Sequence, residues 1–263
     1  MNINKTKIFL SDPQILFREG IHFILSGEDD IEVTGEATNN EDALALIEAN
    51  PPHIIILNNE DKKVSGPETI QRVKKQFPFL SAILTIDKKD EEQLFEAIKS
   101  GAVACLTKDA DPEHLLHIIR DISQGALLII EELLTPEMAA KVLSEFEDTK
   151  SLNKEMDHLM AVLAPKEMLI LTNIAAGSTL EQVTAKMNMD AASVRNHLKL
   201  IVNKLVTNDQ TRIIISTIQY SLAPGMAAGG PTRFAEAYLT REEFTRFKDT
   251  LAKRLKDVVG KTV

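Results

Sequence analysis

Short apolar segments alternate with longer amphipathic segments along the first half of the chain. The short segments are bounded by polar residues, which predicts five strands: Lys7–Ser11, Ile31–Ala37, His53–Leu57, Ser81–Ile86 and Ala102–Lys108. The longer segments repeat apolar residues at spacings of three and four, which predicts five helices: Ile15–Leu25, Asn40–Ala49, Pro67–Gln76, Glu91–Ser100 and Pro112–Ser123. Strands and helices in this order predict βαβ crossovers, and therefore a doubly wound, five-stranded parallel sheet.

Local signals support two of these helix boundaries. Asp111 is a plausible N-cap, because Pro112 follows it at the first helical position. Gly101 can adopt the left-handed conformation that ends the helix before it.

Polar residues end or follow the predicted strands. The carboxyl edge of a parallel sheet is where its ligand sites form, and here four residues should meet there: Asp12, Asn58, Thr85 and Lys108. Asn58 directly follows the apolar run Ile54–Leu57 and carries a neutral amide rather than a carboxylate.

The second half of the chain is predicted to be helical. Residues 127–162 are acidic and contain no glycine, which predicts a helical linker with Thr135 as the N-cap before Pro136. Apolar repeats in this linker suit either pairing with a second chain or docking on a neighbouring domain.

Residues 163–222 show helical periodicity with clear stop and start signals, which are Gly177, the capping-box pair Thr179 and Gln182, and Asp190. The helix that Asp190 begins should run to about Val206 and break at Thr207–Asp209, before a fourth helix over Gln210–Tyr220. A short helix, a tight turn and a longer amphipathic helix form a helix-turn-helix.

The last segment has two parts. Ala223–Thr232 is a flexible joint rich in Gly, Ala and Pro, and a capping box at Thr240 and Glu243 begins an amphipathic helix over residues 240–259. We expect this helix to pack on its own chain, to form a dimer contact, or to meet an external partner or the DNA flank. The predicted domains are therefore residues 1–126, 127–162, 163–222 and 223–263.

Composition restricts the class of protein. Of the 263 residues, 44% are hydrophobic and 26% are charged, and no apolar run approaches the roughly 20 residues that span a bilayer, so we expect a soluble protein without membrane contact. The single cysteine, Cys105, suits a reducing cytoplasm, and within an apolar strand it is more typical of a buried hydrophobe than of a redox sensor. The sequence has no zinc spacing, P-loop or GxGxxG motif, so we predict no cofactor, no metal and no enzymatic activity.

Charge is distributed unevenly. The net charge of −9 combines −9 in residues 1–126 and −5 in residues 127–162 with +2 in residues 163–222 and +3 in residues 223–263. Such asymmetry favours nucleic-acid contact by the less acidic half.

Residues 5–125 resemble the receiver domain of response regulators, which has a flavodoxin-like fold, and "SDPQILFREG" is similar to the opening of NarL/LuxR-type regulators. The resemblance implies two adjacent acids that hold Mg²⁺, an aspartate after the third strand that accepts phosphate, and a Thr and a Lys that sense it. This chain matches Asp12, Thr85 and Lys108, but it has Pro13 for the second acid and Asn58 for the acceptor.

These departures predict an atypical receiver, or pseudo-receiver. One carboxylate is a poor Mg²⁺ site, and an amide is no nucleophile toward a phosphoryl donor. We therefore expect a degenerate phosphorylation pocket, with input from an unidentified protein or small molecule instead. Asn58 could also bind Lys108 and mimic one fixed state.

Residues 163–222 resemble the four-helix LuxR/GerE-type DNA-binding domain in three segments, "LAPKE", "AAGSTLEQVTAKM" and "ASVRNHLKLIVNKL". The resemblance makes Asp190–Val206 the recognition helix. Its predicted buried stripe is Val194, Leu198, Ile201, Val202 and Leu205.

The opposite face of this helix carries the candidate DNA contacts. Arg195, Asn196 and Lys199 should read bases, because Arg and Lys suit guanine and Asn suits adenine. Four more residues are placed for phosphate or positioning contacts: Thr179, Ser193, His197 and Lys204. For His197, packing is an equal alternative.

These features predict a phosphorylation-independent transcriptional regulator that binds double-stranded DNA as a homodimer. The fold class is α/β plus all-α: a receiver-like domain, a helical linker, a helix-turn-helix domain and an extra C-terminal helix. The alternative is a protein-interaction module whose pseudo-receiver docks a partner and whose DNA binding is vestigial. Salt-dependent retention on DNA separates the two.

Overall fold

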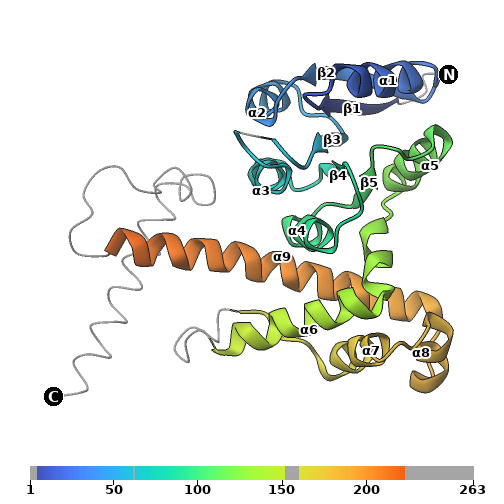
Figure 1. The fold of residues 1–263 in the computed structure, drawn as a ribbon, viewed down its shortest axis with the longest axis vertical. Coiled ribbons are helices and arrows are strands. Elements are labelled where there is room, and N and C mark those ends of the chain that lie inside the picture. The colour runs from blue at the N-terminus through green and yellow to red at the C-terminus, as the bar shows by residue number, and fades with distance from the viewer. Residues whose placement is uncertain (1–4, 62, 152–159, 223–263) are drawn as a thin grey trace. The chain divides into compact units, whose positions relative to one another are not determined.

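The computed structural model describes residues 5–61, 63–151 and 160–222 (Figure 1). The predicted C-terminal helix over residues 240–259 lies outside them. The chain separates into two compact units, Met1–Thr207 and Asn208–Val263.

A five-stranded parallel sheet in the order β2-β1-β3-β4-β5 organises the N-terminal half. The strands are β1 (Thr6–Ser11), β2 (Ile31–Ala37), β3 (Ile54–Asn58), β4 (Ser81–Ile86) and β5 (Ala104–Thr107). The helices between and after them are α1 (Ile15–Ser26), α2 (Asn40–Ala49), α3 (Gly66–Gln76), α4 (Glu91–Ser100) and α5 (Pro112–Ser123). The doubly wound sheet predicted from the alternating pattern is confirmed, and the element ends move by no more than two residues.

The helices cover both faces of the sheet. One apolar cluster joins alternate strand residues to Leu25 of α1 and to the buried side of α5. A second cluster joins the other strand residues to α2, α3 and α4. Because both faces are covered, β3 is buried along its whole length, as its unbroken apolar run predicts.

Capping explains where several helices begin and end. The side chain of Asp111 accepts a hydrogen bond from the backbone N of Glu113 at the start of α5. Gly101 follows α4 with φ +87°, which a residue with a side chain rarely adopts. Both predicted signals are confirmed.

The linker begins with a 3₁₀ helix, η1 (Leu128–Leu134), and continues as α6 (Pro136–Ser151). The Thr135 hydroxyl accepts from the backbone N of Met138, as expected of the N-cap. The helix-turn-helix region follows as α7 (Pro165–Ala175), α8 (Leu180–Met187) and α9 (Ala191–Leu222).

The predicted break at Thr207–Asp209 is wrong, because α9 is one continuous helix of 32 residues. Neither glycine nor proline occurs between Ala191 and Leu222 to force a stop. Thr, Asn and Asp cost only about 0.5 kcal/mol each relative to good helix formers. The Thr207 hydroxyl donates to the carbonyl of Asn203, so it is satisfied inside the helix.

Candidate functional site: a filled pocket and a recognition helix

The carboxyl edge of the sheet brings together the four residues that the sequence placed there. Asp12 follows β1, Asn58 ends β3, Thr85 lies near the end of β4 and Lys108 follows β5. Asp12, Asn58 and Thr85 are between 3% and 4% exposed, so the charge of Asp12 needs a partner inside the protein.

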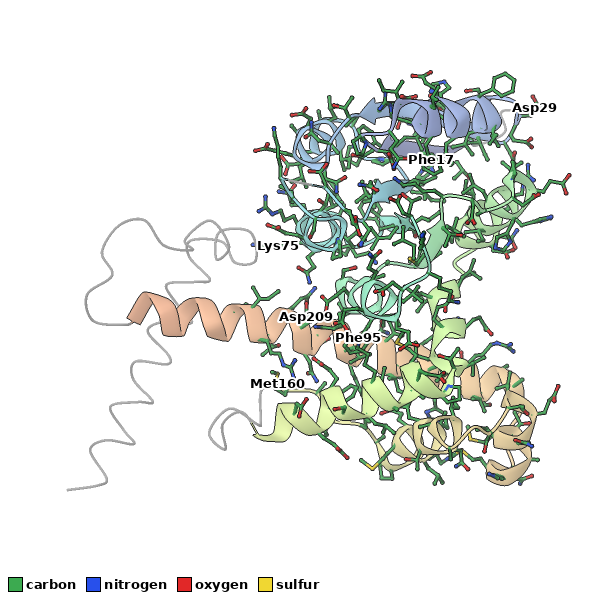
Figure 2. All side chains as sticks on the ribbon, in the orientation of Figure 1. Phe17, Asp29, Lys75, Phe95, Met160 and Asp209 are labelled. Atoms are coloured by element: carbon green, nitrogen blue, oxygen red, sulfur yellow. The ribbon has the colours of Figure 1, made fainter. Side chains whose placement is uncertain are left out.

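Lys108 supplies that partner. Its Nζ lies 3.0 Å from Oδ2 of Asp12 and 3.2 Å from Oδ1 of Asp87. The ammonium also lies 5.3 Å from the ring centroid of Phe17, which is labelled in Figure 2. Asp87 was missed at the sequence level because it lies in a polar turn, where acidic residues are common. Lys108, to which the resemblance assigns phosphate sensing, is thus already paired with two carboxylates.

Asn58 is held by different partners. Its Nδ2 donates to the carbonyl of Glu60, and its own carbonyl accepts from Nδ2 of Asn40 at 3.0 Å. The hypothesis that Asn58 binds Lys108 is therefore wrong for this structure, in which Lys108 pairs with Asp12 and Asp87.

Asn40, which no sequence pattern singles out, links three segments at this edge. Its amide donates to the carbonyls of Asn58 and Val64, and its Oδ1 accepts from the Ser11 hydroxyl at 2.9 Å. Asn40 is fully buried. The neighbouring Asn39 is the N-cap of α2 and accepts a hydrogen bond from the backbone N of Asp42.

Gly66 brings α3 against the same edge. A Cβ at this position would lie 2.5 Å from Cδ2 of Leu84 and 2.8 Å from the carbonyl oxygen of Asn58. Only glycine allows the backbone to approach this closely. The space beside Asn58 is therefore filled by the chain itself.

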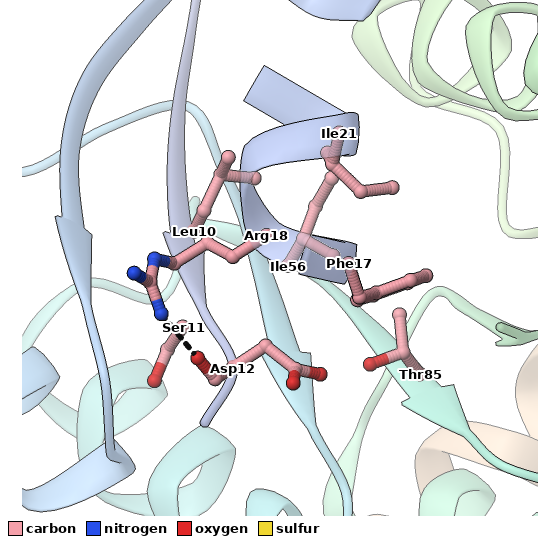
Figure 3. Close-up of a pocket in the computed structure, with 8 residues that line it drawn as sticks. All are labelled: Leu10, Ser11, Asp12, Phe17, Arg18, Ile21, Ile56 and Thr85. Atoms are coloured by element: carbon pink, nitrogen blue, oxygen red, sulfur yellow. Dashed lines mark hydrogen bonds between the residues drawn. The ribbon is translucent and has the colours of Figure 1, made fainter. Parts of the chain in front are cut away.

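A small cavity remains on the α1 side of this edge (Figure 3). Asp12, Arg18 and Thr85 line it together with apolar side chains such as Ile56. Arg18 donates from Nη1 to the carbonyl of Asp12 at 2.8 Å and from Nε to Glu36 at 3.0 Å. The Thr85 hydroxyl donates to the carbonyl of Leu57.

These residues do not fit a Mg²⁺ ion. The ion needs several oxygen ligands including carboxylates, but Asp12 is already paired with Lys108, and the side chain of Pro13 has no oxygen. Across the described part of the chain, no group of three or more His, Cys, Asp or Glu residues could hold a metal.

Cys105 lies partly buried in β5. Burial raises the pKa of its thiol to about 12, with a smaller contribution from the charge of Glu132. The thiol therefore stays protonated at neutral pH, which disfavours a redox-sensing role.

The helix-turn-helix is positioned by the predicted caps. The Thr179 hydroxyl accepts from the backbone N of Gln182 in a complete capping box. The turn after α8 passes through Asn188 in the left-handed conformation. Asp190 then accepts from the backbone N of Ser193, and this hydrogen bond lowers the pKa of Asp190.

The first half of α9 has the faces that the sequence predicted. All five stripe residues are buried: Val194, Leu198, Ile201, Val202 and Leu205. Asn196 is exposed, whereas Arg195, His197 and Lys199 are half-buried. Nδ1 of His197 is buried without a hydrogen-bond partner, and its phosphate contact stays a prediction.

Arg195 has a partner that the sequence did not indicate. Its Nε donates to Oε1 of Glu131 in η1 at 2.7 Å, and its Nη2 lies 3.4 Å from Oε2. Both side chains remain 40% to 46% exposed. The leading candidate for base reading therefore makes a solvent-accessible ion pair with the linker.

Lys204, for which a phosphate contact stays a prediction, has a partner inside the protein. Its Nζ lies 2.6 Å from Oε2 of Glu167 in α7, and the Glu167 side chain is only 2% exposed. The same oxygen accepts from the backbone N of Ala164. Lys204 thus neutralises a buried charge and ties α9 to the start of α7.

No helix within the described residues is long and apolar enough to cross a membrane.

Comparisons with known proteins agree with both halves of this description. The profile of the response regulator receiver domain matches residues 8–120, and the profile of bacterial regulatory proteins of the luxR family matches residues 161–217.

Two bacterial regulators align with this chain over nearly their whole length. The uncharacterized transcriptional regulatory protein YxjL of Bacillus subtilis is 28% identical over 219 residues, which cover 83% of this chain and 98% of YxjL. The transcriptional regulatory protein DegU of Brevibacillus brevis is 25% identical, with 83% of this chain and 95% of DegU covered. Among solved structures, the receiver domain of the putative response regulator NarL from Mycobacterium tuberculosis is 24% identical, with a TM-score of 0.44 and coverage of 46% of this chain and 98% of that chain.

In this chain a receiver domain precedes a luxR-family domain. The two regulators align with this chain over 98% and 95% of their own length. The protein is therefore a response regulator of the NarL/LuxR type, with a receiver domain and a LuxR-type helix-turn-helix DNA-binding domain.

Proposed function

We propose that this response regulator controls transcription without phosphorylation of its receiver domain, and that it binds operator DNA as a dimer through residues 190–206. The observation that carries the first part is Asn58 at the acceptor position, bound to Glu60 and Asn40 within a filled edge of the sheet. An amide cannot attack a phosphoryl donor, and Lys108 is already neutralised by Asp12 and Asp87.

The DNA-binding part rests on the recognition helix. Its buried stripe leaves Asn196 exposed and Lys199 half-exposed, and Arg195 is held only through an exposed ion pair. A phosphate or base edge can replace Glu131 as the partner of Arg195, because an exposed pair contributes less than about 1 kcal/mol. The specificity of operator binding favours a dimer. One recognition helix reads few base pairs, and two helices on paired half-sites read enough of them to select the operator.

The test of phosphorylation independence is intact-mass measurement after incubation with acetyl phosphate and Mg²⁺. The wild-type protein and Asn58→Asp should both keep their mass, because Pro13 still withholds the second carboxylate. Asn58→Asp combined with Pro13→Asp is the positive control and should gain one phosphoryl group. Stoichiometric phosphate on the wild-type receiver domain would contradict the proposal.

The second candidate function is a protein-interaction module in which DNA binding is vestigial. The Arg195–Glu131 pair favours it, because this pair occupies the principal base-reading cation. Retention on operator-containing DNA decides between the two functions. A transcription factor should bind with an affinity that falls steeply with salt, whereas a module with vestigial binding should elute at low salt.

A further inference from the structure

The most exposed face of the recognition helix carries no charge. Its exposed residues recur at spacings of four and three and form one stripe, which consists of Ala192, Asn196, Leu200, Asn203 and Thr207. At 3.6 residues per turn, these positions lie within about 80° of one another around the helix axis. The exposed face of an amphipathic helix normally carries charged as well as polar residues. This stripe offers only apolar groups, amides and a hydroxyl.

Two cations border the stripe on one side. Arg195 and Lys199 are half-buried, and Arg195 is paired with Glu131. When the stripe faces the floor of a major groove, both cations lie beside it, within reach of a guanine or of a phosphate. The centre of the contact is then left to uncharged side chains.

The side chains at the centre of the stripe are available to a ligand. No described residue forms a hydrogen bond with the side-chain amide of Asn196 or Asn203, and Leu200 is 48% exposed. Asparagine is a poor helix former, and an exposed leucine keeps its apolar surface in water. Neither residue type stabilises the free helix at these positions, which supports a role in a complex.

The edges of A·T base pairs match this chemistry. In the major groove, adenine presents the N7 acceptor beside the N6 donor, and one asparagine amide can pair with both. Thymine presents an apolar C5 methyl group, whereas neither base of a G·C pair has an apolar group in this groove. Charged side chains are the usual partners of guanine and cytosine. An uncharged stripe therefore favours A·T pairs over G·C pairs.

We propose that Asn196 and Leu200 select A·T base pairs at the centre of each half-site, with Asn196 on adenine and Leu200 on the C5 methyl group of thymine. This inference rests on the proposed DNA-binding function and specifies the base pairs that the helix selects. Four residues separate the two side chains, a rise of about 6 Å, which spans one to two base-pair steps of about 3.4 Å. Ala192, one turn earlier, is small enough to let the start of the helix approach the bases closely.

The experiment begins with the selection of operator duplexes from a random library by the full-length protein. Each thymine of the selected half-site is then replaced in turn by uracil, which removes only the C5 methyl group. Fluorescence anisotropy measures the affinity. Replacement of one central thymine should lower the affinity of the wild-type protein about three- to fivefold, which is the contribution expected of one buried methyl group.

Variants connect that methyl group to one side chain. Leu200→Ala should bind the thymine duplex about three- to fivefold more weakly than wild type, and should bind the uracil duplex no more weakly than the thymine duplex. Leu169→Ala is the matched control, because Leu169 is 52% exposed on α7, outside the recognition helix. It should keep the affinity of wild type and the sensitivity to uracil. Circular dichroism checks that both variants are folded.

A second variant tests the amide. Asn196→Ala should lower the affinity about tenfold and should no longer distinguish adenine from 7-deazaadenine, which lacks the N7 acceptor, at one central position. The wild-type protein should bind the 7-deazaadenine duplex more weakly than the adenine duplex.

Two results would overturn the proposal. One is a selected half-site in which no thymine can be replaced by uracil with a loss of affinity. The other is a uracil replacement that weakens Leu200→Ala as much as wild type, as expected if Leu200 contacts a protein instead. Sequence-selective, salt-dependent binding in either case would leave the proposed DNA-binding function intact. A wild-type protein that no DNA retains would reject that function and this inference together.

Discussion

The carboxyl edge of the sheet and the recognition helix differ in how deeply their paired polar groups are buried. At the edge, Asp12 and Asn58 are almost fully buried and bound to other groups of the chain. On the helix, Arg195 is bound to a single carboxylate, and both partners are open to solvent. Removing a buried partner costs several kcal/mol, whereas an exposed pair contributes less than about 1 kcal/mol.

This difference indicates where control can act. A ligand cannot easily displace the buried partners at the sheet edge, which supports the proposal that this edge is not phosphorylated. In the proposed function, DNA displaces Glu131 from Arg195 at little cost. Helix α9 contains both kinds of contact, because Lys204, nine residues after Arg195, holds the buried Glu167.

The largest effect should come from the buried pair of the recognition helix. Lys204→Met leaves Glu167 charged and unpaired in the interior, so the free energy of unfolding should fall by about 3 kcal/mol. Urea denaturation of the full-length chain measures it. Adding Glu167→Gln should restore most of the loss, because it removes the unpaired charge. If Lys204→Met kept full stability and lost only DNA affinity, the original phosphate-contact role would be correct.

A somewhat smaller loss is expected at the sheet edge. Asn40→Ala leaves the carbonyls of Asn58 and Val64 without their donor, and should lower the free energy of unfolding by about 2–3 kcal/mol. Asn39→Ala, at the adjacent exposed N-cap, should cost only about 1 kcal/mol. Equal losses for the two variants would show that Asn40 does not organise this edge.

The effect of the base-reading cation should appear in affinity rather than stability. Arg195→Ala should lower specific DNA affinity about ten- to a hundredfold and relax one operator position, because a good base contact is worth roughly 1–3 kcal/mol. The thermal midpoint should stay close to that of wild type. Fluorescence anisotropy on an operator and its single-base variants measures both affinity and specificity. Unchanged binding by Arg195→Ala and Lys199→Ala combined would mean that this helix is not the reader.

The smallest expected effect tests whether the linker residue Glu131 competes with DNA for Arg195. Glu131→Gln weakens the partner of Arg195, and should raise DNA affinity by about two- to fivefold, since an exposed pair is worth roughly 0.2–1 kcal/mol. Glu132→Gln, which breaks the pair with Lys89 instead, is the neighbouring control. Equal affinities for wild type and Glu131→Gln would mean that the linker does not compete with DNA.

Local sequence determined the secondary-structure elements, the helix caps and the chemistry available at position 58. Alternating periodicity predicted the parallel sheet, and the caps at Asp111, Thr179 and Asp190 act as their side-chain chemistry requires. The proposal that position 58 accepts no phosphate also rests on residue identity alone, because no tertiary contact converts an amide into a nucleophile.

Only the tertiary structure decided which charged side chains pair with one another. Lys204 finds Glu167 and Arg195 finds Glu131 across 37 and 64 residues, and no local pattern encodes such separations. The same holds for α1, where contacts of Arg18 with Asp12 and Glu36 outweigh the apolar pattern and leave Leu16 and Phe23 in solvent. Local propensity decides where helices form, but the energy of buried charges and hydrogen bonds decides which side of each helix faces the interior.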